Sequence, residues 1–172
     1  MPDDSVTRYI VVGVTQKQPP AVVHHALRIA HRFDAVLVCA NVDPGSYVVT
    51  ENPDGSVEAR PIDPDAPDWT SSPFEGDLAN RIRTAAQEVG VQVEFRELAG
   101  DIAHALGRLG DVLRAEMIVV GSRHRGLRSS IQEFLGGSVA AHLAHRQHRP
   151  VVVIPVAPVP AGDRLPWEET DS

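Results

Sequence analysis

Four short runs of aliphatic residues recur along the chain without alternating polar positions. β-branched side chains dominate these runs, which is typical of strands buried on both faces of a parallel sheet. A fifth run does alternate between apolar and polar residues, so we expect it to form an edge or half-exposed strand. The continuous runs are Tyr9–Val14, Val36–Val42, Met117–Val120 and Val151–Val156, and the alternating run is Val91–Leu98.

Helical patterns fill the intervals between these runs. The second helix is predicted to begin at Ser72–Glu75, which reads as a capping box with proline at the first helical position, and to end at Gly90. Asp101 can cap the third helix. Pro20 suits the first turn of the first helix, and the fourth is predicted before the last strand. The four predicted helices cover residues 20–32, 72–90, 101–113 and 131–144.

Strands and helices therefore alternate from the first strand to the last. This order predicts an α/β, Rossmann-like fold: a doubly wound, five-stranded parallel sheet with helices on both faces and right-handed crossovers. We expect a single domain over residues 1–158. The remaining residues, 159–172, contain proline and acidic side chains and predict a disordered tail.

Residues 43–73 are too many for a simple connection in a compact domain, so this insertion should carry structure of its own. Tyr47–Thr50 and Ser56–Arg60 read as two strands of a β-hairpin, and Asn52–Gly55 between them reads as a proline-initiated turn ending in glycine. The insertion contains seven acidic residues against Arg60 alone, a local balance of −6.

Composition and charge narrow the function classes. The chain has 172 residues, of which 42% are hydrophobic, so global disorder is excluded. No apolar run is long enough to span a membrane, and the acidic N-terminus does not resemble a secretory signal. A net charge of −7 argues against nucleic acid as a partner. The single cysteine, Cys39, fits a reducing, cytoplasmic location.

The loop after Val120 has the residues that a phosphate-binding loop needs. It contains Gly121–Ser130 and continues to Gly136-Gly137-Ser138. Glycines allow an anion to approach the backbone, a helix N-terminus offers free N–H groups, and arginines add bidentate donors. The alternative interpretation is an ordinary strand-to-helix turn, which also uses glycine and serine.

Several segments in the right order resemble the universal stress protein family. They are the opening Ile10–Val14, the Gly100–Leu106 segment, Gly121-Ser122-Arg123 after an aliphatic strand, Gly137-Ser138-Val139, and His148–Val153. The resemblance covers roughly residues 8 to 157.

The resemblance implies the strand order 3-2-1-4-5, a stress-response function and, in some members, ATP binding. It also implies a homodimer that pairs the last strands, here Val151–Val156. Strands one and four would be neighbours, so Thr15 and Gly121 would face one crevice. The implied nucleotide-binding residues are Thr15, Val42, Gly121, Ser122, Arg123, Gly137, Ser138 and Val139.

The sequence departs from the family's ATP-binding pattern at named positions. His124 stands where the second glycine belongs, the spacing from Gly121 to Gly137-Ser138 is longer than the pattern, and Thr15 replaces an aspartate. The alternative hypothesis is therefore a dimeric interaction or regulatory protein of the same fold that binds no nucleotide.

The sequence lacks the motifs of common nucleotide hydrolases and α/β hydrolases. The sequence has no Walker Gly-Lys-Ser/Thr and no nucleophile elbow, and Cys39 lies in mid-strand, so we name no catalytic residue. Two histidines of the fourth helix, His142 and His145, share a face, but Arg146 and Arg149 would repel a cation, and we expect no metal site.

Overall fold

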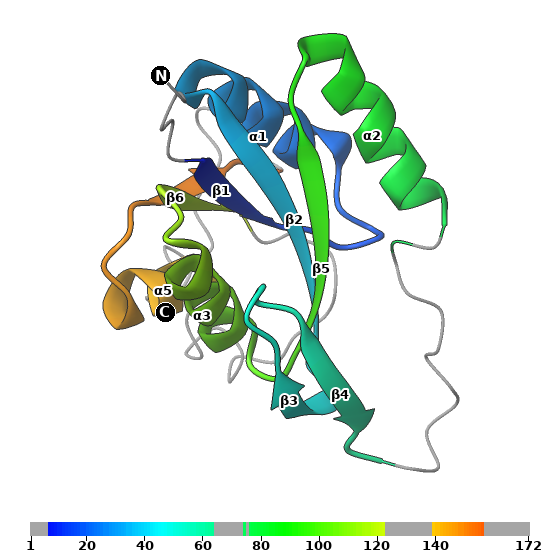
Figure 1. Cartoon of the computed structure of the whole chain (residues 1–172), viewed down its shortest axis with the longest axis vertical. Coiled ribbons are helices and arrows are strands. Elements are labelled where there is room, and N and C mark those ends of the chain that lie inside the picture. Colours follow the sequence, from blue (N-terminus) through cyan, green and yellow to red (C-terminus); the bar gives the residue numbers. More distant parts are fainter. Residues whose placement is uncertain (1–6, 64–73, 75, 123–138, 157–172) are drawn as a thin grey trace, which may run out of the picture.

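The computed structural model describes residues 7–63, 74, 76–122 and 139–156. Strands and helices alternate as the sequence predicts, with one additional hairpin between β2 and α2 (Figure 1). The elements are β1 (Arg8–Gly13), α1 (Pro20–Phe33), β2 (Ala35–Asp43), β3 (Ser46–Glu51), β4 (Val57–Pro61), α2 (Asp77–Val89), β5 (Val93–Ala99), α3 (Ile102–Leu113), β6 (Met117–Gly121), α5 (Val139–Arg146) and β7 (Val151–Ile154).

The main sheet has five parallel strands in the order β5-β2-β1-β6-β7. With the hairpin strands β3 and β4 set aside, this is the predicted order 3-2-1-4-5, and the prediction is confirmed. The alternating strand, β5, lies at one edge of the sheet and β7 lies at the other. The first crossovers extend the sheet from β1 toward β5 and the later ones extend it toward β7, so the direction reverses between β1 and β6.

Both faces of the sheet are buried at β1, β2 and β6, which explains the continuous aliphatic runs of these three strands. Ile10 and Val12 of β1 pack with α1 and α2 in one core cluster. Val11, between them, packs with α3 and Leu143 of α5 in the other. Each fully buried aliphatic side chain contributes about 1.5–3 kcal/mol relative to exposure, so these two clusters supply the main stabilisation of the fold.

Helix ends follow local sequence signals at three of the predicted positions. Pro20 begins α1, and Gly90 ends α2 with φ of 69°. The Asp101 carboxylate accepts a hydrogen bond from the backbone N–H of His104 at 2.8 Å and so caps α3. Ile102, the first residue of α3, is 36% exposed.

The predicted start of the second helix is wrong. α2 begins at Asp77 with Gly76 as its N-cap, and Phe74 lies outside the helix. The Phe74 ring packs against Phe95 of β5 with the ring centroids 4.8 Å apart. Glycine is a poor helix former, and the extended backbone of Gly76 (φ −118°, ψ −157°) separates this aromatic contact from the helix.

Two other boundaries differ from the prediction. α5 extends to Arg146, beyond the predicted end at Ala144, while the predicted start of that helix, 131–138, lies outside the described residues. β7 ends at Ile154 rather than Val156.

The expected tail, 159–172, also lies outside the described part of the chain. None of the helices in the described ranges is long and apolar enough to cross a membrane.

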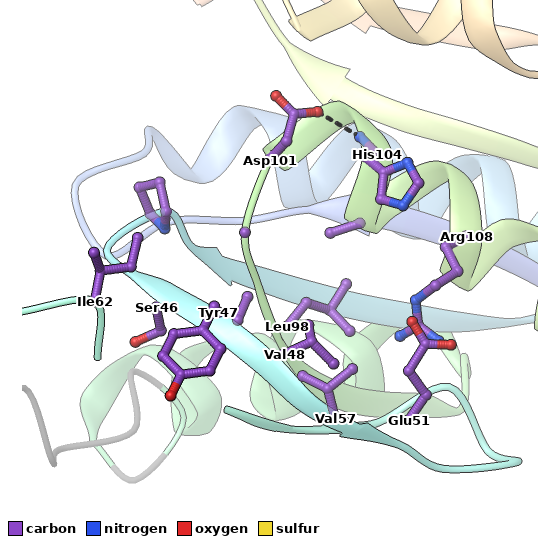
Figure 2. Close-up of a pocket in the computed structure, with 14 residues that line it drawn as sticks. Ser46, Tyr47, Val48, Glu51, Val57, Ile62, Leu98, Asp101, His104 and Arg108 are labelled. Atoms are coloured by element: carbon purple, nitrogen blue, oxygen red, sulfur yellow. Dashed lines mark hydrogen bonds and ion pairs between the residues drawn. The ribbon is translucent and has the colours of Figure 1, made fainter. Parts of the chain in front are cut away.

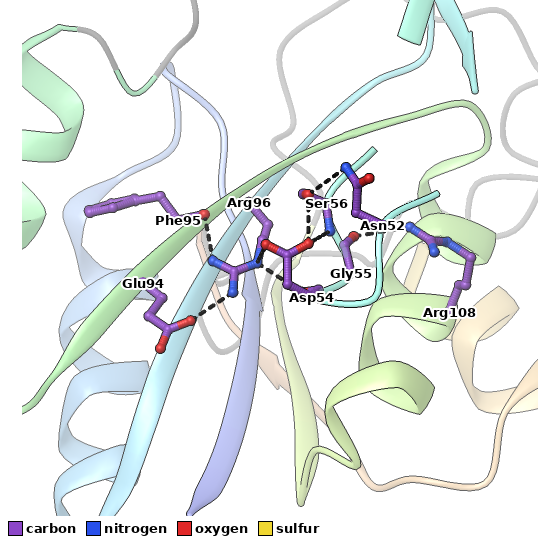
Figure 3. Close-up of polar contacts among 8 residues, drawn as sticks. All are labelled: Asn52, Asp54, Gly55, Ser56, Glu94, Phe95, Arg96 and Arg108. Atoms are coloured by element: carbon purple, nitrogen blue, oxygen red, sulfur yellow. Dashed lines mark hydrogen bonds and ion pairs between the residues drawn. The ribbon is translucent and has the colours of Figure 1, made fainter. Parts of the chain in front are cut away.

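The insertion forms the predicted antiparallel hairpin of β3 and β4. It covers the part of β5 that α3 leaves open, and its turn rests against α3 (Figures 1 and 3). Arg96 of β5 donates to the carbonyl of Asp54 at 3.0 Å, and Arg108 of α3 donates to the carbonyl of Gly55 at 3.1 Å. Two arginines from different elements thus hold the hairpin turn against the domain.

The turn also stabilises itself. The Asp54 carboxylate accepts hydrogen bonds from the hydroxyl of Ser56 at 2.6 Å and from its backbone N–H at 3.0 Å (Figure 3). These bonds, with the nearby Arg96 guanidinium, lower the pKa of Asp54. Gly55 is buried with φ of 84°, and a Cβ there would lie 2.5 Å from Cδ1 of Leu109.

We expect Gly55→Ala to destabilise the protein more than Gly90→Ala. Both glycines have positive φ, which costs a non-glycine residue about 1–2 kcal/mol, but no atom lies within 4 Å of a Cβ at Gly90. The overlap with Leu109 should add about 1–3 kcal/mol at Gly55. Urea unfolding of the two variants measures the difference. Equal losses would show that the turn does not press against α3 in solution.

Candidate functional site

The predicted site residues on strands one, two and four meet at one edge of the sheet. Gly13 pairs with Ala40 and Val12 pairs with Val119. Continuing this register by two residues brings Thr15 level with Val42, and Val14 level with Gly121. The carboxyl ends of β2, β1 and β6 therefore lie side by side, at the reversal of strand order where open α/β sheets bind ligands.

The chain leaves β1 through a tight turn. The N–H of Val14 donates to the carbonyl of Ala40 at 2.8 Å, so β1 stays paired with β2 beyond its last assigned residue. The carbonyl of Thr15 then accepts a hydrogen bond from the N–H of Gln18 at 3.2 Å. This turn leaves the Thr15 side chain exposed and brings Gln18 back toward β6.

Gln18 fills the space above the end of β6. A Cβ at Gly121 would lie 2.9 Å from Nε2 of Gln18 and 3.0 Å from Cγ2 of both Val22 and Val156. Glycine at this position therefore lets the Gln18 amide approach the backbone. The Oε1 atom of Gln18 is buried and has no hydrogen-bond partner among the described residues. A buried acceptor without a partner is costly, so this atom is suited to receive a donor from a ligand or from the neighbouring loop.

Ser122 joins the ends of β6 and β7. Its N–H donates to the carbonyl of Ile154 at 2.7 Å, and its Oγ accepts from the N–H of Val156 at 2.8 Å. The backbone N–H is therefore already used, and the hydroxyl proton is what Ser122 can offer a ligand.

Of the remaining predicted site residues, two are described by the structure and three are not. Val42 is half-buried at the end of β2, and Val139 is half-buried at the first described position of α5. Arg123, Gly137 and Ser138 lie outside the described residues. The described part of the site thus comprises the strand ends, and it includes Gln18, which sequence reasoning missed. Its only sequence signal was its position just before the Pro19-Pro20 helix start.

Comparison with known families identifies the relatives of this chain. The model of the universal stress protein family matches residues 7–155. The chain belongs to the universal stress protein family. A search of curated proteins gives no match to it.

Solved universal stress proteins share the fold. One in complex with cAMP is 24% identical, has a TM-score of 0.58, and the match covers 89% of this chain and 100% of that one. A protein from Archaeoglobus fulgidus in complex with dAMP is 19% identical, with a TM-score of 0.58 and coverage of 87% and 98%. UspA from Lactobacillus plantarum is 19% identical, with a TM-score of 0.56 and coverage of 88% and 99%.

The described residues suit the nucleoside part of a nucleotide. Gln18 offers a buried acceptor for an amino or hydroxyl group, Val42 offers an apolar surface, and Thr15 offers an exposed hydroxyl. The groups expected to hold phosphates lie in residues 123–138, outside the described ranges.

Cys39 does not contribute a nucleophile to this site. It is buried in β2, and burial raises the pKa of its thiol from an ordinary 9.0 to about 12. Thiolate is the reactive form of cysteine, so a thiol with this pKa is inert at neutral pH.

We expect native Cys39 to resist a disulfide exchange reagent at pH 8 and to react rapidly once the protein is unfolded. Because folding raises the pKa of the thiol, the folded state holds its proton longer than the unfolded state. The associated stability is present below pH 9 and is lost as the pH rises toward 12, by up to about 1.4 kcal/mol per pH unit. Denaturant unfolding between pH 8 and 11 should show a steeper decline than in Cys39→Ala. Identical slopes would contradict the assignment.

Proposed function

We propose that this universal stress protein binds an adenine nucleotide at the carboxyl ends of β1 and β6, as part of a cytoplasmic stress response. The observation that carries the proposal is the buried Oε1 of Gln18, which has no hydrogen-bond partner among residues 7–122 and 139–156 that are described, in an amide that lies over Gly121 at the reversal of strand order. The relatives in complex with cAMP and dAMP support an adenine ligand for this fold.

The proposed ligand lies across three strand ends. The adenosine contacts Thr15 and Val42, and Gln18 accepts a hydrogen bond from its amino group or from a ribose hydroxyl. The phosphates extend from Gly121 and Ser122 toward the loop that follows. There Arg123, Gly137 and Ser138 would supply donors, next to Val139, the first described residue of α5. We include ATP among the ligands because the arginine-rich loop can balance several phosphate charges.

Calorimetric titration with ATP, ADP, AMP and cAMP tests the proposal. We expect saturable binding of at least one of them, abolished by Gly137→Trp. Gln18→Leu should weaken binding by about fivefold to tenfold, the effect of one lost hydrogen bond. Gln16→Leu is the matched control, because Gln16 is exposed in the same turn, and it should bind as the wild type does. No heat at millimolar concentration of any of the four would contradict the proposal.

We further propose that the protein is a homodimer joined through β7. This strand lies at the edge of the sheet, and Val153 is 44% exposed there. An unprotected aliphatic edge favours pairing with another strand, and a second copy of the chain offers a matching strand.

The same edge favours the second candidate function, an interaction protein that binds no nucleotide. The calorimetric result decides between the two functions.

We expect Val153→Lys to convert the dimer to a monomer, because the charge would be buried at the strand pair. Light scattering after size-exclusion chromatography measures the mass directly. Val49→Lys is the control, since Val49 is 50% exposed on the hairpin, away from β7, and it should remain dimeric. A wild-type protein that is monomeric at micromolar concentration would overturn the dimer.

A further inference from the structure

A cavity of about 460 Å³ lies between the hairpin and the main domain, apart from the proposed nucleotide site (Figure 2). One wall is the β3–β4 hairpin, and the other is the end of β5 with the first two turns of α3. Its lining includes no residue of β1, β6 or α5. Its volume falls within the range of about 300–1,000 Å³ that is common for small-molecule sites. The insertion therefore creates this cavity, which the five-stranded sheet alone would not have.

The centre of the cavity is apolar. Val48 and Val57 project from the hairpin, and Leu98 faces them from the end of β5 (Figure 2). Leu98, and Ala105 of α3, are 3% and 4% exposed and belong to the core cluster on this face of the sheet. The Tyr47 ring, 49% exposed, stands at the rim. Two apolar walls with an aromatic ring at the opening suit a flat, largely apolar ligand.

The arginine that lines the cavity is already paired. The Arg108 guanidinium, mostly buried, lies 3.1 Å from the Glu51 carboxylate and also donates to the carbonyl of Gly55. The Asp101 carboxylate caps α3 through the N–H of His104. An anionic ligand would lose hydration here without gaining a free positive charge, because Arg108 is already paired, and it would also meet the negative charge of Asp101. An uncharged ligand would not pay that penalty.

We propose that this cavity binds a small, uncharged, planar ring compound. The ring lies against Val48 on the open side of the cavity and contacts Tyr47 at the rim. The His104 imidazole, exposed on the α3 wall, is positioned to exchange a hydrogen bond with a polar group on the ring edge. The site takes a neutral ligand and differs in this from the proposed nucleotide site, which takes an anion.

Three probes with one ring system and different charges test this inference: indole, tryptamine and indole-3-acetate. Each is titrated into the full-length ¹⁵N-labelled protein and followed by amide NMR shifts. We expect indole to give saturable shifts centred on residues 46–48 and 98–105. Indole-3-acetate should bind at least fivefold more weakly, whereas tryptamine should bind within about threefold of indole, because an exposed carboxylate such as that of Asp101 adds little to the binding of a cation. A parallel titration with AMP should shift the ends of β1 and β6 instead, so the two sites can fail independently.

Two substitutions on neighbouring residues provide the structural control. Val48→Trp should fill the cavity and abolish the indole shifts, whereas Val49→Trp, on the exposed side of the same strand, should leave them unchanged. Tyr47→Ala removes only a rim contact from a half-exposed position and should weaken indole severalfold without unfolding the hairpin. The inference is overturned if indole shifts do not saturate, if they centre elsewhere, if Val49→Trp abolishes them equally, if indole-3-acetate binds as tightly as indole, or if tryptamine binds more than tenfold more tightly than indole.

Discussion

Burial of both faces of the sheet is the constraint on which the rest of this structure depends. β1, β2 and β6 carry aliphatic side chains on both sides, so helices must cover both. Right-handed crossovers then place α1 and α2 on one face and α3 and α5 on the other. The change of face requires a reversal of direction between β1 and β6. The position of the candidate site thus follows from the topology, before any particular side chain is considered.

The edge strand β5 requires a second solution. α3 mainly covers β2, β1 and β6, so one face of β5 would remain open without the insertion. The hairpin takes that place, and Arg96 and Arg108 hold its turn by hydrogen bonds to backbone carbonyls. A hairpin alone is marginally stable in water, so its order depends on these contacts and on the close fit of Gly55 under Leu109.

Much of the fold could be predicted from the sequence because its signals are local. Continuous aliphatic runs indicated the central strands, the alternating run indicated the edge strand β5, and Asn52–Gly55 indicated the hairpin turn. The continuous run at Val151–Val156 was misleading, because β7 lies at the other edge of the sheet and Val153 is 44% exposed. The start of α2 could not be predicted in this way. Phe74 lies outside the helix and packs on Phe95 of β5, and a local capping pattern carries no information about such a long-range contact.

The candidate site was predictable only where the topology determines it. Thr15, Val42 and Gly121 follow directly from strand ends, so their proximity could be anticipated. Gln18 could not, because its place over Gly121 depends on how the β1–α1 turn folds back. For the same reason, the hydrogen bonds of Arg96 and Arg108 to the hairpin turn could not be predicted. Their partners are 42 and 53 residues away in sequence.

The junction between β2 and the hairpin shows how an insertion can add a cavity without disturbing the sheet. Asp43, the last residue of β2, accepts a hydrogen bond at its carbonyl from the N–H of Gly100, at the turn into α3. Its carboxylate accepts from the N–H of Gly45 and the hydroxyl of Ser46, where the hairpin begins. One residue thus closes the ladder to β5 and starts the hairpin. Val42, immediately before it, stays in register with Leu98. The strand ends keep the geometry that the fold imposes, and the additional walls of the cavity come entirely from residues that follow.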